Sequence, residues 1–280
     1  LSMKNYFKLL NFEINRFIKL YIALMITIAF IQITGTIVES LKYMSIVKSN
    51  VIKYGMSERE FLETHYEFNF IEIVYSLWIF GPIAIGVAIL LLYVFFIWYR
   101  DWFSKSMFIY RLLMLPTSRM NIFFAKVTTI MLTVLGLIGF QIVLFMIELQ
   151  IIKWIVPKVF RIDVTIPEIT SGIYHLSIIF PEDFTGFIIN YGLGFAFVVV
   201  TFTAILFERS YKLKGLLIGI VYVLFMMNLF ILPFIIQLVI FGSLYLYADE
   251  MLFIETVIWL LVIGSSFLIS RYLLNNKVTV

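Results

Sequence analysis

The side chains that commonly carry out catalysis are scarce in this chain, and their spacing forms no catalytic set. There are no cysteines, and neither histidine, His65 or His175, belongs to a cluster of carboxylates and thiols that would hold a metal ion. The serines of Gly264-Ser265-Ser266 have no histidine in a neighbouring apolar segment to serve as a base. No GxxxxGK[ST] phosphate loop is present. We therefore expect no catalytic residue, no cofactor-binding residue and no metal ligand, and we do not expect an enzyme.

Ionisable residues inside apolar stretches are the remaining candidates for chemistry, because a charge in hydrocarbon is costly. Four glutamates fall at or near the ends of such stretches: Glu39, Glu72, Glu148 and Glu255. We expect these carboxylates to reach the lipid headgroups. The deeper polar residues are uncharged: Gln32, Gln141, Asn228 and Gln237. They are expected to join helices by hydrogen bonds, or alternatively to line a transit path.

The composition is that of a membrane protein. Of the 280 residues, 62% are hydrophobic and only 14% are charged, whereas globular domains carry about 25% charged residues. The mean hydropathy is +1.04. The net charge of +4 is explained by basic residues in membrane loops, so we expect no nucleic acid as a partner. We predict a multi-pass membrane protein in contact with the lipids of its membrane.

The apolar segments predict an all-α integral membrane protein with six transmembrane helices. Each segment has at least about the 20 residues that a membrane-spanning helix needs. The six predicted spans are residues 20–38, 71–98, 122–147, 184–207, 215–245 and 251–269. Two polar segments, 39–70 and 148–183, are predicted to be outer loops. The first contains a capping box, Ser57 with Glu60, that indicates a short helix, and residues 156–169 alternate enough to allow a short strand.

The distribution of charge predicts that both termini are cytoplasmic. Of the 21 lysines and arginines, 14 fall on the predicted inner side, against only 3 of the 17 acidic residues. An excess of Lys and Arg marks the cytoplasmic side of a membrane protein. Residues 1–19 include an amphipathic pattern, which predicts an interfacial helix on that side. The alternative is that this segment is simply the polar start of the first span.

Proline and glycine interrupt two of the predicted spans. Gly81 and Pro82 lie in the second span, and Pro233 lies in the fifth. A proline removes a helical hydrogen bond and can kink or break a helix, so each site is a candidate gate. Each is equally a candidate packing device, because transmembrane helices tolerate both residues.

The loop between the second and third spans is long, basic and rich in aromatic residues. Its segment Leu112–Arg119, followed by Lys126, resembles the LL-x-x-P-x-SR-x6-K pattern of permeases of ABC-2-type transporters. The six predicted spans, the two inner termini and the amphipathic start are also similar to that family. Among its branches, the chain is similar to the permeases of Gram-positive peptide exporters, including those of the phenol-soluble-modulin type, which implies a multi-pass protein of a bacterial plasma membrane.

The resemblance implies that this first inner loop docks on a separate ATPase subunit. The implied coupling residues are Asp101, Trp102, Phe103, Lys105, Met107, Phe108, Tyr110, Arg111, Pro116 and Arg119. Arg119 and Lys126 would position the loop at the membrane edge. The second inner loop would make a lesser contact through Glu208, Arg209, Tyr211 and Lys212. Apolar and aromatic anchors on a polar loop are typical of an interface core, although the same aromatics could rest on the bilayer surface instead.

The expected function is that of a transmembrane subunit of an ATP-driven ABC exporter. As the resemblance implies, residues 1–280 would form a single permease domain that pairs with a second copy or a paralogue. Two ATPase subunits would bind ATP and Mg²⁺, and the complex would extrude an amphipathic peptide, a toxin or a lipid-like molecule. The alternative is a non-transporting immunity or sensor protein that binds peptides through its outer loops.

Overall fold

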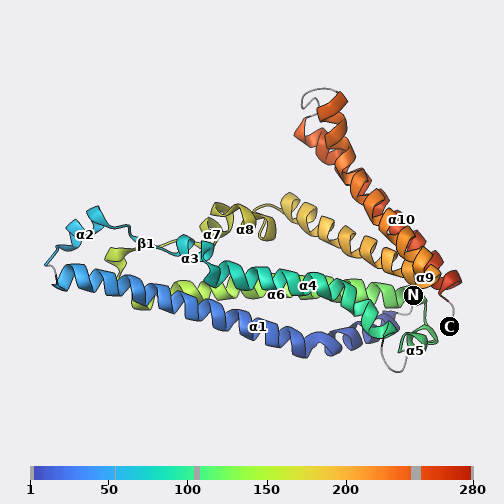
Figure 1. The fold of residues 1–280 in the computed structure, drawn as a ribbon, viewed down its shortest axis with the longest axis horizontal. Helices are drawn as coiled ribbons and strands as arrows, with labels where there is room; N and C mark the ends of the chain where they lie inside the picture. Colours follow the sequence, from blue (N-terminus) through green and yellow to red (C-terminus); the bar gives the residue numbers. More distant parts are fainter. Residues whose placement is uncertain (1–2, 54, 104–107, 241–246, 279–280) are drawn as a thin grey trace. The chain divides into compact units, whose positions relative to one another are not determined.

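The fold is all-α, as predicted. The computed structural model describes residues 3–53, 55–103, 108–240 and 247–278, and 89% of the structure is helical (Figure 1). Within these residues, five helices are long and apolar enough to cross a membrane. They are α1 (Met3–Lys48), α4 (Leu77–Trp102), α6 (Arg119–Ile155), α9 (Phe184–Ile240) and α10 (Ala248–Tyr272).

Helix α9 contains the fourth predicted span and residues 215–240 of the fifth, whose last residues, 241–245, lie outside the described part of the chain. Its backbone leaves the helical conformation at Lys212, where φ is 55° and ψ is −130°. Gly215 lies directly beyond this point, and a Cβ atom there would fall 2.0 Å from the carbonyl oxygen of Phe207. Only glycine permits so close a return of the backbone. The chain therefore turns between two helical stretches at the predicted second inner loop.

Two helix boundaries differ from those expected from the sequence. Helix α1 is continuous through residue 19, so the amphipathic segment and the first span form one helix, and the π-helix η1 (Ser49–Lys53) extends it. The segment 39–48 was expected in a loop, but it contains no proline or glycine and remains helical. The second span is instead divided at Ser76, whose hydroxyl donates to the carbonyl oxygen of Ile73. Helix α4 then passes through Gly81 and Pro82 without interruption.

Short elements occupy the two segments predicted to be outer loops. Helix α2 (Glu58–Thr64) begins as predicted, with the Ser57 hydroxyl accepting a hydrogen bond from the backbone N–H of Glu60. Strands β1 (Phe68–Asn69) and β2 (Arg161–Ile162) pair in parallel, which confirms a short strand in the second segment. The other short elements are α3 (Phe70–Tyr75), α5 (Phe108–Leu113), η2 (Lys158–Phe160), α7 (Ile166–Gly172), α8 (Tyr174–Ile179) and η3 (Leu273–Lys277).

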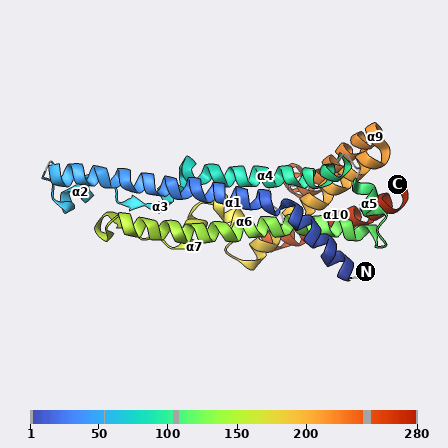
Figure 2. The ribbon, with the colours of Figure 1, turned by 90° about the horizontal axis from the view of Figure 1, so that it is seen from below.

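The chain forms two compact units, each with its own apolar core. The first unit is Leu1–Asn15, Leu91–Met131 and Ile189–Val280, and the second is Arg16–Leu90 and Leu132–Ile188. In the second unit, α1, α4 and α6 run side by side in both views (Figures 1 and 2). Its core includes buried aromatic rings from both polar segments and from α6: Phe61, Phe68, Phe70, Phe145, Phe160 and Phe180. These contacts make the short elements part of a packed body.

Within the second unit, α1 and α4 approach closely at Gly35. A Cβ atom at Gly35 would lie 2.4 Å from Cβ of Trp78, an atom fixed to the α4 backbone. We expect Gly35→Ala to lower the free energy of unfolding by about 1–3 kcal/mol, because the two helices must separate. Equilibrium unfolding in mixed micelles, followed by tryptophan fluorescence, measures this change.

The matched control is Gly139→Ala on α6, where a Cβ atom would meet nothing within 4 Å. Alanine favours a helix over glycine, so this variant should be unchanged or stabilised by up to about 1 kcal/mol. Equal effects of the two substitutions would contradict the close approach.

Candidate functional site

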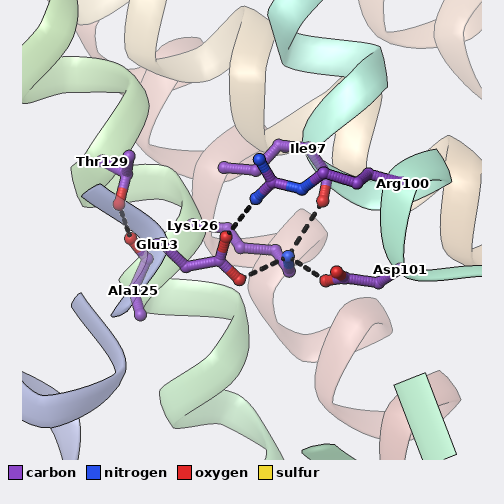
Figure 3. A network of polar contacts seen from close by, with 7 residues as sticks. All are labelled: Glu13, Ile97, Arg100, Asp101, Ala125, Lys126 and Thr129. Carbon is purple, nitrogen blue, oxygen red and sulfur yellow. Dashed lines mark hydrogen bonds and ion pairs between the residues drawn. The ribbon is translucent and has the colours of Figure 1, made fainter. Parts of the chain in front are cut away.

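A buried ionic cluster, which we call the Lys126 network, joins three helices of the first unit (Figure 3). The Lys126 Nζ atom donates to Glu13 Oε1 at 2.7 Å, to Asp101 Oδ2 at 2.5 Å and to the Ile97 carbonyl oxygen at 2.9 Å. The Lys126 side chain is 0% exposed, and those of Glu13 and Asp101 are buried with it. Arg100 Nη2 donates to Glu13 Oε2 at 2.8 Å. Two cations and two carboxylates therefore balance within the cluster.

The helices bring these side chains together by ordinary periodicity. Ile97, Arg100 and Asp101 stand at i, i+3 and i+4 and so share one face of the last turns of α4. Lys126 comes from the start of α6 and Glu13 from the start of α1. Lys126 Nζ also lies 5.2 Å from the centre of the Trp98 ring. The low-dielectric surroundings strengthen the ion pairs, but they would also penalise any charge left alone.

The opposite face of the same turns of α4 holds a second cluster, which we call the Arg209 cage. The guanidinium carbon of Arg209 lies 4.9 Å from the centre of the Tyr99 ring, 5.5 Å from Trp102 and 4.7 Å from Phe103. The Tyr99 hydroxyl donates to the carboxylate of Glu208. A guanidinium within about 6 Å of an aromatic face is attracted to the ring electrons. The first and second predicted inner loops are thus in direct contact.

The predicted coupling residues divide into buried and exposed groups. Asp101 is completely buried in the Lys126 network, so in this structure it is not a surface residue. Phe103 is 73% exposed, and Arg111 on α5 is exposed as well. Pro116 is exposed in the turn before α6. Lys105 and Met107 lie outside the described residues.

The remaining predicted residues occupy several different places. Phe108 stacks on Phe12 of α1, with ring centres 5.6 Å apart, and Tyr110 meets Trp102 edge to face. Arg119 donates to the carbonyl oxygens of Leu274 and Val278, at 2.5 and 2.9 Å. It therefore ties the loop to the C-terminal segment.

The other inner-loop and proline positions lie apart from the clusters. Tyr211 and Lys212 are exposed beyond the Arg209 cage. Gly81 and Pro82 belong to the second unit, and Pro233 lies farther along α9. None of these residues forms part of the Lys126 network as the structure describes it.

Glu13 was not selected from the sequence, although it is central to the network. Its partners, Arg100 and Lys126, lie 87 and 113 positions away in the sequence. The one signal in the sequence for an ion pair at Glu13 is that it is an isolated acid in a basic segment. Gln32 and Gln141 do join helices as expected, exchanging amide hydrogen bonds of 3.1 and 3.0 Å. The expectation for Glu148 was wrong, because its side chain is enclosed by the second unit and does not extend outward.

Metal chemistry has no support among the described residues. No group of three or more His, Asp or Glu side chains there is arranged to hold an ion. Comparison with family models, with curated proteins and with solved structures finds no match to this chain.

The Lys126 network predicts a large penalty for removing its central cation. In Lys126→Met, Asp101 and Glu13 both lose their ion pair with the Lys126 ammonium group, while the ion pair between Glu13 and Arg100 remains. We expect the free energy of unfolding to fall by about 3–5 kcal/mol, as measured by unfolding in mixed micelles.

Two further variants make this test specific. Asp101→Asn combined with Lys126→Met removes opposite charges together and should recover much of the loss, since Glu13 keeps Arg100. Lys42→Met breaks an exposed pair with Glu39, of 3.6 Å, and should change stability by no more than about 0.5 kcal/mol. An equal loss in the single and double variants would show that the ionic pairing is not what stabilises this region.

Proposed function

We propose that this chain is the transmembrane subunit of an ATP-driven exporter of the ABC-2 type. A separate ATPase subunit would bind ATP and Mg²⁺, and two copies of it would drive this chain together with a second copy or a paralogue. The cargo would be an amphipathic peptide, a toxin or a lipid-like molecule. Supporting features are the five long apolar helices and the basic segments between them.

The observation that carries the proposal is the pair of clusters on the last turns of α4. One face of these turns is held by Lys126 and Glu13, and the other holds Arg209. Exposed Phe103 and Arg111 flank the same turns. A force applied to these exposed residues would reach α1, α4, α6 and α9 through buried ion pairs and ring contacts. Such a connection suits a subunit that is moved by a partner.

The proposed topology has six spans, with both termini in the cytoplasm of a bacterium. Helix α9 would supply two spans that turn at Lys212, and α1 would lie partly in the interface. The Lys126 network and the Arg209 cage would then lie on the cytoplasmic side, where Lys and Arg are enriched. In that position the exposed Phe103 and Arg111 beside them would face the ATPase.

We expect the exposed residues near the end of α4 to bind the ATPase. In Phe103→Ala combined with Arg111→Ala, binding of the ATP-binding subunit encoded beside this chain should weaken at least about tenfold. The reason is that aromatic and arginine side chains dominate interface energies. Retention of that subunit after purification in mild detergent measures the effect.

The matched control is Tyr66→Ala combined with Arg59→Ala, which removes an exposed aromatic residue and an exposed arginine from the segment predicted to lie outside. This variant should retain the ATPase fully. If the native chain retains no ATPase, or if both double variants retain it equally, the proposed docking site is wrong.

A second candidate function is an immunity or sensor protein that binds peptides outside the cell. The specific support is the packed body formed by the segments around β1 and β2, which presents Tyr66 at 90% exposure and Tyr174 at 76%. Exposed aromatic side chains on an ordered surface are typical anchors for a peptide.

Under this second candidate, Tyr66→Ala combined with Tyr174→Ala should abolish binding of a labelled amphipathic helical peptide to the purified protein. Fluorescence anisotropy in detergent measures the binding. Tyr211→Ala, an exposed tyrosine of the predicted inner loop, is the control and should bind normally. Loss of peptide binding without loss of ATPase retention would assign the outer segments a recognition role.

A further inference from the structure

Glu148 is a carboxylate enclosed within the second unit. It lies on α6, its side chain is 0% exposed, and neither carboxylate oxygen has a hydrogen-bond partner among the described residues. In the Lys126 network, by contrast, each carboxylate meets a cation. Glu148 therefore differs from Glu13 and Asp101, the other fully buried acids among the described residues.

The surroundings of Glu148 are apolar on its own helix. Phe145 and Ile152, at i−3 and i+4, share its face of α6, and both belong to the buried core of the second unit. The Phe145 ring also meets Phe70 of α3 edge to face, at 6.0 Å, and lies 6.2 Å from Phe180. Buried apolar side chains therefore lie one turn to either side of Glu148 on α6.

Helix α1 brings two hydroxyl groups to this level. Gln32 bonds to Gln141, which stands two turns before Glu148 on the same face of α6, and Val47 of α1 packs in the core with Ile152. Between these two contacts, the buried stretch of α1 carries Thr36 and Ser40. The Thr36 hydroxyl is itself without a hydrogen-bond partner among the described residues, while Ser40 donates to the Thr36 carbonyl oxygen.

An ionised carboxylate cannot persist in such a place without compensation. Burial of an unpaired charge costs roughly several kcal/mol per ion, even after the protein relaxes. The charge of the carboxylate must therefore be neutralised. A divalent cation would require several oxygen ligands, commonly six or more, and the described residues include no cluster of three acidic or histidine side chains. A single proton satisfies the charge without further ligands.

The neighbouring elements supply no counter-charge that the structure shows in contact with Glu148. The titratable groups on the parts of α1, α3, α6, α7 and α8 that form or flank this core are Glu39, Lys42, Tyr43, Lys48, Glu72, Tyr75, Lys153, Glu168, Tyr174 and His175. Lys42 pairs with Glu39, the Tyr43 hydroxyl donates to backbone carbonyls, and the His175 ring lies against Phe80. Within the second unit, α4 contributes no titratable side chain.

We propose that Glu148 is a proton-binding site, protonated while α1, α3 and α6 are packed around it and deprotonated when that packing opens to water. Opening of the second unit would then release one proton, and closing would take one up. The site is a link between proton binding and helix movement that is independent of any ATPase. It would exist under either candidate function.

The test is infrared difference spectroscopy of the full chain in lipid vesicles at neutral pH. Subtracting the spectrum of Glu148→Gln from that of the native protein should leave the C=O band of one protonated carboxyl group per chain. The matched control is Glu63→Gln, an exposed glutamate of α2, which should leave only carboxylate bands. Replacing choline by sodium in the buffer should not alter the Glu148 band.

Three results would overturn the proposal. A carboxylate band in the Glu148 difference spectrum would show that the group is ionised, and loss of the protonated band in sodium would assign the site to an alkali cation. If Glu148→Gln does not fold, the native spectrum still tests the site for a protonated carboxyl group, because exposed carboxyl groups are ionised at neutral pH. The absence of any protonated carboxyl band there would exclude the site. Retention of the ATPase is measured separately, so failure of one proposal leaves the other standing.

Discussion

The first unit depends on the neutralisation of Lys126. An ammonium group with no access to water must have its charge balanced, and here Glu13 and Asp101 balance it from two other helices. The three helix segments are consequently fixed at one level, since each carboxylate is acceptable only in contact with the same cation. The apolar rings of Trp98, Phe123 and Phe202 pack against one another, and the Trp98 ring lies beside the Lys126 ammonium group. Specific pairing and close packing thus support each other.

The last turns of α4 make specific contacts with other helices on two opposite faces. The ionic face fixes α4 to α1 and α6, and the aromatic face fixes it to Arg209 on α9. Long apolar helices alone would slide and rotate in a bilayer, because lipid tails solvate them as well as neighbouring helices do. Polar contacts of this kind set the register. They also make α4 the element through which a movement at the adjoining loop would spread.

In the second unit, the register between helices is fixed with fewer charged side chains. The amide pair of Gln32 and Gln141 fixes α1 against α6, and the core around Phe61 and Phe160 fixes the short elements. Glu148 is the exception, a carboxylate without a cation, and its burial carries a cost that the first unit avoids. A group retained at such a cost in a membrane segment is a candidate for function.

Local features of this protein followed from the sequence because they depend on neighbouring residues. The apolar segments, the start of α2 at Ser57 and the turn near Lys212 are each set by composition or by a short motif. The sequence also placed charged and aromatic residues in the loop after α4, but it did not separate buried Asp101 from exposed Phe103. Only the tertiary structure paired Glu13 with Lys126, placed Arg209 over three rings and enclosed Glu148. These outcomes depend on which helix faces meet across about a hundred residues, and helical periodicity specifies a face without specifying its partner.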